Sequence, residues 1–174
     1  PLLRREFELE QGHGAVARAV LLATAHGVFE AFVNGVPVSD DVLSPGWSSY
    51  EWRLRYCEWE VTHLLAPTNV LGLAIGNGWY RGRLTWLGAR ALYGAELGAF
   101  AQLEITFADG HRQLIVTDRS WSAGPPAVLA NDLYDGQTID ARRTSGAWQR
   151  PGFASDEWTT VHEEEFDTSV LTPY

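Results

Sequence analysis

The sequence contains no methionine, no lysine and only one cysteine among its 174 residues. A single cysteine, Cys57, excludes an intrachain disulfide and a thiolate metal cluster. Because even position 1 lacks methionine, we expect the chain to be a fragment of a longer protein. No apolar run approaches the roughly 18 residues that a membrane-spanning helix requires, so we expect no membrane partner. No secretory signal is visible, which leaves the compartment open between secretion and the cytoplasm and slightly favours the cytoplasm.

Basic residues are few in this chain. The 13 arginines are outnumbered by 22 acidic residues, which gives a formal net charge of -9. Such a chain is a poor match for a phosphate backbone, so we expect no nucleic-acid partner. Hydrophobic residues nevertheless make up 45% of the sequence. That proportion is typical of a globular protein and excludes a disordered one.

Long amphipathic helices are also absent from the pattern, and short strands with tight turns take their place. Asn34-Gly35, Asp109-Gly110 and Asp135-Gly136 are hairpin-turn signals, because Asn, Asp and Gly tolerate positive φ. Apolar and polar residues alternate between positions 100 and 107, as in a half-buried strand. We therefore predict an all-β fold, an antiparallel β-sandwich of jelly-roll type. We assign 1–161 to a single domain and 162–174 to an acidic tail or the start of a linker.

Aromatic residues are concentrated in one part of the chain. Nine of them lie between positions 47 and 93, many in loop-like contexts beside Arg, Asn and Asp. An aromatic plane stacks on the apolar face of a sugar ring, while polar neighbours bind its hydroxyls. We expect a solvent-facing sugar contact among Trp47, Trp79 and Trp86. The alternative is that these rings fill the core and anchor long loops.

The stretch 76–83 combines three glycines with two aromatic residues and two arginines. It predicts a loop with unusual backbone angles and outward side chains, of which Asn77, Tyr80, Arg81 and Arg83 are candidate ligand contacts. It is not a phosphate loop, because no Lys-Ser or Lys-Thr pair follows. The alternative for the two arginines is pairing with acids inside this domain or on a neighbouring one.

A third candidate lies in residues 134–142. Asp135 and Asp140 are candidates for a carboxylate pair or for calcium ligands, although calcium needs six or more oxygens. The alternative places Asp135 in a turn and pairs Asp140 with an arginine. The five histidines are scattered without metal-ligand spacing, so we do not expect zinc.

The ordered motifs resemble the N-terminal β-sandwich domain of bacterial α-L-rhamnosidases, glycoside hydrolase family 78. The resemblance rests on a series of short motifs that spans almost the whole chain: 34–35, 43–47, 61–62, 69–72, 76–82, 93–94, 117–121, 134–137 and 140–142. Two positions depart from the family pattern. Gln137 replaces an acid, which weakens any metal site there, and Glu60 conservatively replaces an Asp.

The resemblance implies a parent enzyme that removes terminal L-rhamnose with two carboxylates in a separate helical barrel domain. We therefore assign no catalytic residue here and expect an accessory module that recognises L-rhamnose-containing glycosides. The candidate sugar-binding residues are Trp47, Asn77, Trp79, Tyr80, Arg81, Arg83, Asp135 and Gln137. Calcium at Asp135 and Asp140 is the one cofactor considered. The alternative is a structural module that docks on the catalytic domain of the same chain and shapes its entrance.

Overall fold

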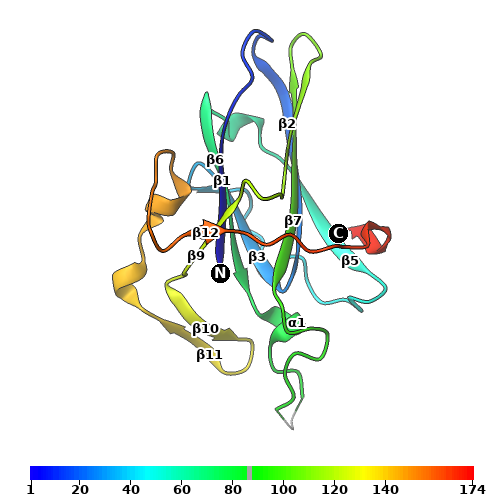
Figure 1. Cartoon of the computed structure of the whole chain (residues 1–174). Coiled ribbons are helices and arrows are strands. Elements are labelled where there is room, and N and C mark those ends of the chain that lie inside the picture. Colours follow the sequence, from blue (N-terminus) through cyan, green and yellow to red (C-terminus); the bar gives the residue numbers. More distant parts are fainter. Residues whose placement is uncertain (86–87) are drawn as a thin grey trace.

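Two sheets form a sandwich in the computed structural model, which describes residues 1–85 and 88–174 (Figure 1). The first sheet has the order β12-β9-β1-β6-β3-β4. Its strands are β1 (Leu2–Glu8), β3 (Val28–Val33), β4 (Val36–Pro37), β6 (Thr68–Gly76), β9 (Ser122–Gly124) and β12 (Thr159–Thr160). All of its pairings are antiparallel.

The second sheet has the order β13-β5-β2-β7-β8. Its strands are β2 (Val16–His26), β5 (Leu54–Glu60), β7 (Gly98–Phe107), β8 (Arg112–Val116) and β13 (Leu171–Pro173). A separate two-stranded ribbon consists of β10 (Val128–Asp132) and β11 (Gly136–Ile139). The helical elements are short: α1 (Gly78–Arg81) and four 3-10 turns, at Thr62–Leu64, Ala141–Arg143, Gly146–Gln149 and Thr168–Val170. Within the described ranges, none of these helices could reach across a bilayer.

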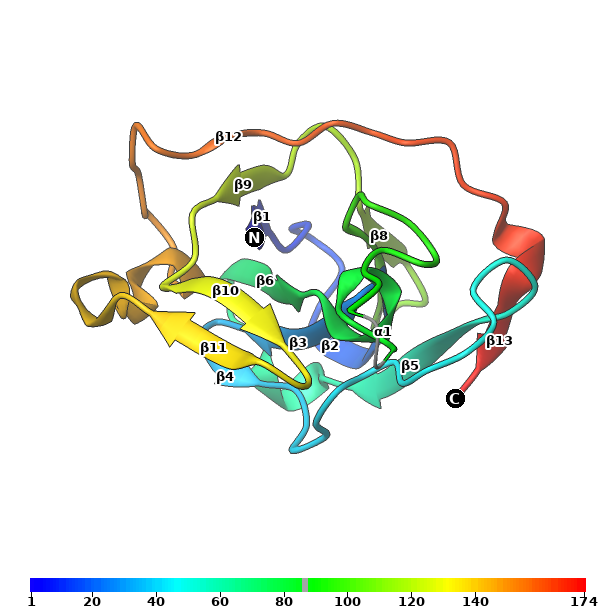
Figure 2. The same ribbon diagram turned by 90° about the horizontal axis from the view of Figure 1, so that it is seen from below.

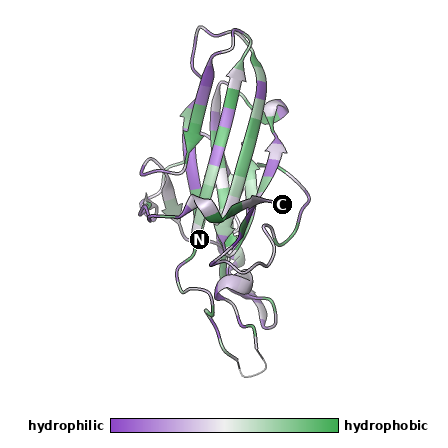
Figure 3. Ribbon diagram, turned by 90° about the vertical axis from the view of Figure 1, so that its right-hand side faces the viewer, coloured by the Kyte–Doolittle hydropathy of each residue, from purple (hydrophilic) through white to green (hydrophobic). Residues whose placement is uncertain are grey.

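The hydrophobic core lies between the two sheets. On β7, the alternate residues Ala101, Leu103, Ile105 and Phe107 are buried, as the sequence pattern predicts. They meet residues of β3 and β6 in one continuous cluster, which the Trp121 indole joins. Hydrophobic and hydrophilic bands consequently alternate along the strands (Figure 3). The predicted β-sandwich is confirmed.

The three predicted hairpin turns are present. Asn34 and Gly35 both have positive φ, 53° and 82°, where β3 turns into β4. Gly110 and Gly136 also have positive φ in the β7–β8 and β10–β11 turns. Local residue preferences therefore determine the position of each turn.

The C-terminal segment closes the edge of the second sheet. Residues 171–173 form β13, which pairs in parallel with β5, whereas every other strand pair is antiparallel within the described ranges. Phe166, Val170 and Leu171 pack against a second small cluster centred on Tyr50 and Tyr80. Part of the segment 162–174 thus contributes apolar side chains to the packed domain.

Candidate functional site

The short helix α1 lies at one end of the sandwich, between the β10–β11 ribbon and β5 (Figure 2). Its first residue must be glycine for two reasons: Gly78 has a φ of 51°, and a Cβ there would lie only 2.5 Å from a methyl group of Val28. Asn77 ties the helix to the ribbon, because its backbone N–H donates to Asn131 Oδ1 and its Nδ2 donates to Asn131 O, both at 2.6 Å. The stretch 76–83 is thereby fixed against β10.

Trp47 and Trp79 form the aromatic part of the site. Their rings are parallel within 3°, with centroids 6.3 Å apart, as in an offset stack. The Trp47 indole N–H donates to the Tyr93 hydroxyl at 3.1 Å, which fixes its orientation. Trp47 is 53% exposed, whereas Trp79 is half-buried. Trp86, the third candidate, lies outside the described residues.

Tyr80 requires a correction, because the structure buries its ring. The ring stacks on His26 at 4.5 Å and meets Tyr50 edge-on at 5.1 Å, leaving 8% of Tyr80 exposed. Burial raises the pKa of Tyr80 and, with the neighbouring tyrosines, raises the pKa of Tyr50 to about 12. A Cβ at Gly94 would collide with the Tyr80 hydroxyl oxygen. Tyr80 therefore supports α1 from inside and offers no face to a sugar.

Arg81 and Arg83 are held by groups of this domain. Arg81 Nε donates to Asn77 Oδ1 at 2.7 Å, and Arg81 Nη1 donates to Ala95 O at 3.4 Å. Arg83 Nη2 lies 2.9 Å from Asp135 Oδ1, and its guanidinium carbon lies 5.1 Å from the Tyr134 ring centroid. Arg83 thus follows the internal-pairing alternative.

Asp132 is the central acid of this cluster, and sequence reasoning missed it. Its Oδ2 accepts from Arg83 N at 2.9 Å and from Arg90 Nη1 at 2.7 Å, and Arg90 Nη2 continues to Asp135 Oδ2 at 2.6 Å. Its Oδ1 accepts from Tyr134 N at 2.9 Å. Burial alone would raise the pKa of Asp132, but these donors outweigh it and lower the pKa to about 2. The only local signal was an acid just before a Tyr-Asp-Gly turn.

Asp135 and Asp140 are each paired with arginines. Asp140 receives Arg142 Nε and Nη2, both at 2.8 Å, and its Oδ1 caps the next turn by accepting from Arg142 N. Asp135 is shared by Arg83 and Arg90. Both carboxylates therefore already have guanidinium partners. A calcium ion would have to displace these arginines and gather six or more oxygen ligands.

A groove of about 670 Å³ runs between the ribbon, residues 143–149 and the strands β3 and β6. Its lining combines apolar and polar side chains, among them Val28, Ile75, Leu133, Trp148, Asn131, Asp132, Gln137 and Gln149. A volume of this size is within the usual range for small-molecule sites, roughly 300–1,000 Å³. Of the sequence-predicted residues, Gln137 alone lines this groove among those described, and the tryptophan pair lies outside its lining.

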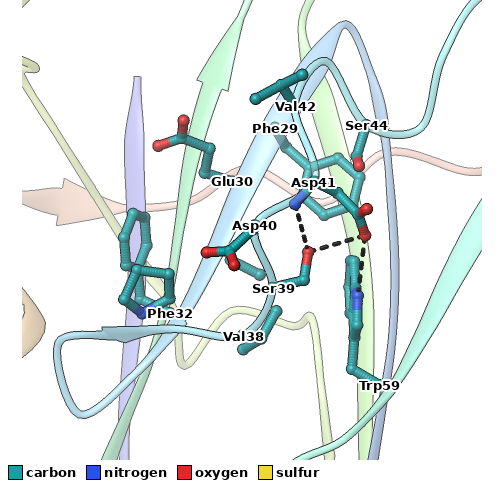
Figure 4. A pocket seen from close by; sticks show the side chains of 12 residues that line it. Phe29, Glu30, Phe32, Val38, Ser39, Asp40, Asp41, Val42, Ser44 and Trp59 are labelled. Atoms are coloured by element: carbon teal, nitrogen blue, oxygen red, sulfur yellow. Dashed lines mark hydrogen bonds between the residues drawn. The ribbon is translucent and has the colours of Figure 1, made fainter.

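A second, smaller pocket of about 180 Å³ lies beside β3 (Figure 4). Its walls include Phe29, Trp59 and the acidic residues Glu30, Asp40 and Asp41. The Asp41 carboxylate accepts from the Ser39 hydroxyl and from the Trp59 indole N–H. This volume falls below the roughly 300 Å³ at which small-molecule sites begin.

Comparison with known proteins identifies relatives of this chain. The chain is 38% identical over 166 residues to an "Alpha-L-rhamnosidase" of Streptomyces avermitilis, covering 95% of the chain and 16% of that protein. A Formosa agariphila "Alpha-L-rhamnosidase" is 36% identical over 91% of the chain and 17% of its own length. The chain thus spans about one-sixth of these relatives.

Solved structures agree with this relationship. Native α-L-rhamnosidase from Aspergillus terreus matches with a TM-score of 0.93 and 35% identity, over 98% of the chain and 20% of that protein. The Streptomyces avermitilis enzyme, solved with L-rhamnose, matches with a TM-score of 0.87, over 92% of the chain and 16% of that protein. The family model described as "Alpha-L-rhamnosidase N-terminal domain" matches residues 14–174. The chain therefore belongs to the α-L-rhamnosidase N-terminal domain family.

Proposed function

We propose that this chain is a non-catalytic, carbohydrate-recognising accessory domain of an enzyme that removes terminal L-rhamnose from glycosides. The observation that supports it most is the Trp47 indole, which is 53% exposed and is oriented by Trp79 and Tyr93. An exposed, pre-oriented aromatic plane binds a sugar ring with little further loss of side-chain entropy. The hydrolytic carboxylates would belong to another domain of the same protein.

Polar residues on α1 and just outside it would supply hydroxyl partners. Asn77 immediately precedes the helix that carries Trp79, and Arg81 is the last residue of that helix. Arg83, which follows this helix, pairs with Asp135, and such a pair would both donate to and accept from sugar hydroxyls. The C6 methyl group of L-rhamnose would add apolar contact with an indole. Gln137, in the adjacent groove, would meet a further sugar unit of a longer glycoside.

Titration calorimetry with L-rhamnose tests this proposal. The assay must reach a Kd of about 1 mM, or roughly -4 kcal/mol. We expect Trp47→Ala to abolish saturable binding and Trp52→Ala to preserve it, because Trp52 is 80% exposed but has no part in the stack. Chelator should leave binding unchanged, since arginines occupy Asp135 and Asp140. Equal affinities of the wild type and Trp47→Ala would refute the assignment.

A second candidate function is docking on the catalytic domain, and the β10–β11 ribbon favours it. Among the described strands, these two pair only with each other. The ribbon exposes Leu129 at 60%, Tyr134 at 64% and Ile139 at 48%. An isolated two-stranded ribbon is marginally stable in water, so a covering partner would stabilise it. The remaining length of the relatives supplies a candidate for that partner.

The docking candidate is tested in the complete enzyme. Leu129→Ser should lower the thermal midpoint and activity of that enzyme, because it removes an apolar contact from the interface. Leu114→Ser is the matched control, since Leu114 is 54% exposed on β8, in the other sheet. If the two variants behave alike, the ribbon does not dock.

A further inference from the structure

The end of the sandwich opposite α1 brings together two segments that are about 100 residues apart in the sequence. The loop between β1 and β2, residues 9–15, meets the β7–β8 hairpin there (Figure 1). Ala108 N donates to Ala15 O at 2.9 Å. The Gln113 side chain accepts from Glu10 N and donates to Glu8 O. The two segments are therefore held in a fixed register.

Two histidines stack between these segments. The rings of His13 and His111 have centroids 3.7 Å apart and lie within 10° of parallel. Both rings also meet the Phe107 ring, with centroid distances of 5.7 and 5.8 Å. Phe107 is 2% exposed, so the imidazoles rest on the edge of the core. This packing restricts the positions that both rings can adopt.

Carboxylates flank the histidine pair on both sides. His13 Nδ1 lies 2.8 Å from Asp109 Oδ2, and His111 Nε2 contacts the Glu10 carboxylate. Asp109 Oδ1 also accepts from His111 N at 2.8 Å, which lowers the pKa of Asp109 together with the hydrogen bond from His13. The ligand atoms of Glu10, His13 and His111 all lie within 4.8 Å of one another.

We propose that Glu10, His13 and His111 bind a divalent transition-metal ion of the Zn²⁺ class. Two imidazole nitrogens and one carboxylate oxygen are a common zinc ligand set, with water completing a tetrahedron. Asp109 acts as a positioning residue, because accepting the Nδ1 proton of His13 leaves the Nε2 lone pair of that ring for a metal. The ion clamps the 9–15 loop to the hairpin.

The geometry needs only a small adjustment to accept the ion. Zinc–ligand bonds of 2.0–2.1 Å place tetrahedral ligands roughly 3.3 Å apart. The Glu10 side chain is 49% exposed and can rotate toward the ion, while the stacked His13 and His111 rings stay in place. The charges of Glu10 and Asp109 together balance a divalent cation.

The experiment is titration of the metal-free chain with Zn²⁺ alone, near neutral pH. We expect one ion per chain with a Kd of about 10 µM or tighter. His111→Gln and Glu10→Gln should each weaken binding at least tenfold, and Asp109→Asn should weaken it by about 10- to 100-fold. Glu10 is at the surface, so its variant keeps the test valid if His111→Gln fails to fold.

His162→Gln is the matched control. His162 also lies beside an acid, with 3.9 Å between its Nε2 and Glu164 Oε1, but His162 is 86% exposed and belongs to no such cluster among the described residues. Its variant should bind Zn²⁺ like the wild type. Zinc should raise the thermal midpoint of the wild type and of His162→Gln but not of His111→Gln. No stoichiometric binding, or equal binding by His111→Gln and the wild type, would overturn the proposal.

Discussion

Replacing Asp132 with Asn tests the role of the carboxylate that joins α1 to the ribbon. The Asp132 side chain is 5% exposed and accepts hydrogen bonds from Arg83 N, Tyr134 N and Arg90. The fall of its pKa from 3.8 to about 2 corresponds to roughly 2 kcal/mol of preferential stabilisation of the folded state. Solvent around the half-exposed Arg90 screens part of this energy. In the Asn variant, the side-chain NH2 group would also point at N–H donors that the carboxylate now accepts from, which adds to the loss. We expect Asp132→Asn to lower the free energy of unfolding by about 2 kcal/mol at neutral pH.

The pH dependence of this loss gives the stricter test. A carboxyl whose pKa is lower in the folded state stabilises fully above its unfolded pKa, here 3.8. That stabilisation disappears as the pH falls from 3.8 through about 2. Urea unfolding of the wild type and of Asp132→Asn should therefore give a difference that shrinks across this window. Asp156→Asn, at an exposed aspartate, controls for the change of charge. A difference that stays constant down to the acid limit would refute the argument.

Two further stability predictions concern buried side chains. Asn69 is fully buried and forms hydrogen bonds with the Asn34 side chain and with both the N–H and C=O of Ala66. Chemical denaturation of Asn69→Ala should therefore show a free energy of unfolding lower by about 3 kcal/mol. A decrease of less than about 1 kcal/mol would contradict this prediction. Trp148 is 8% exposed and covers Gly72, where a Cβ would lie 2.7 Å from Trp148 Cζ3. Trp148→Ala should therefore destabilise the chain by about 3 kcal/mol and speed proteolysis within 141–150. Unchanged proteolysis would show that other contacts hold this segment.

The sequence was sufficient where the determining interactions are local. The turns at Asn34-Gly35, Asp109-Gly110 and Asp135-Gly136 follow from residues that adopt positive φ themselves. The alternation along residues 100–107 likewise follows from the two-residue period of a strand. These local signals favoured the β-sandwich. The order of the short motifs carried the resemblance to the α-L-rhamnosidase N-terminal domain, and the family model confirms that membership.

Only the tertiary structure decided which side chains meet across long sequence distances. Trp79 and Tyr80 are adjacent in a mixed aromatic stretch, yet Trp79 is half-buried and stacks with Trp47, whereas Tyr80 is buried against His26. Nothing near Asp132 in the sequence shows that Arg83 N and Arg90 will bond to it. Such contacts depend on which loops the strand order brings to the same end of the sandwich.

The histidines show the same limit. His13 and His111 are 98 residues apart and have no metal-ligand spacing, so their positions in the sequence do not indicate a zinc site. The β2–β7 pairing, which matches Val16 with Phe107, brings their loops to one end of the second sheet. Local propensity therefore determined the turns, the strands and the fold class of this chain. The pairing of distant strands determined the clusters around Asp132 and around the two histidines. The residues of each cluster are far apart in the sequence, and only the assembled sheets bring them together.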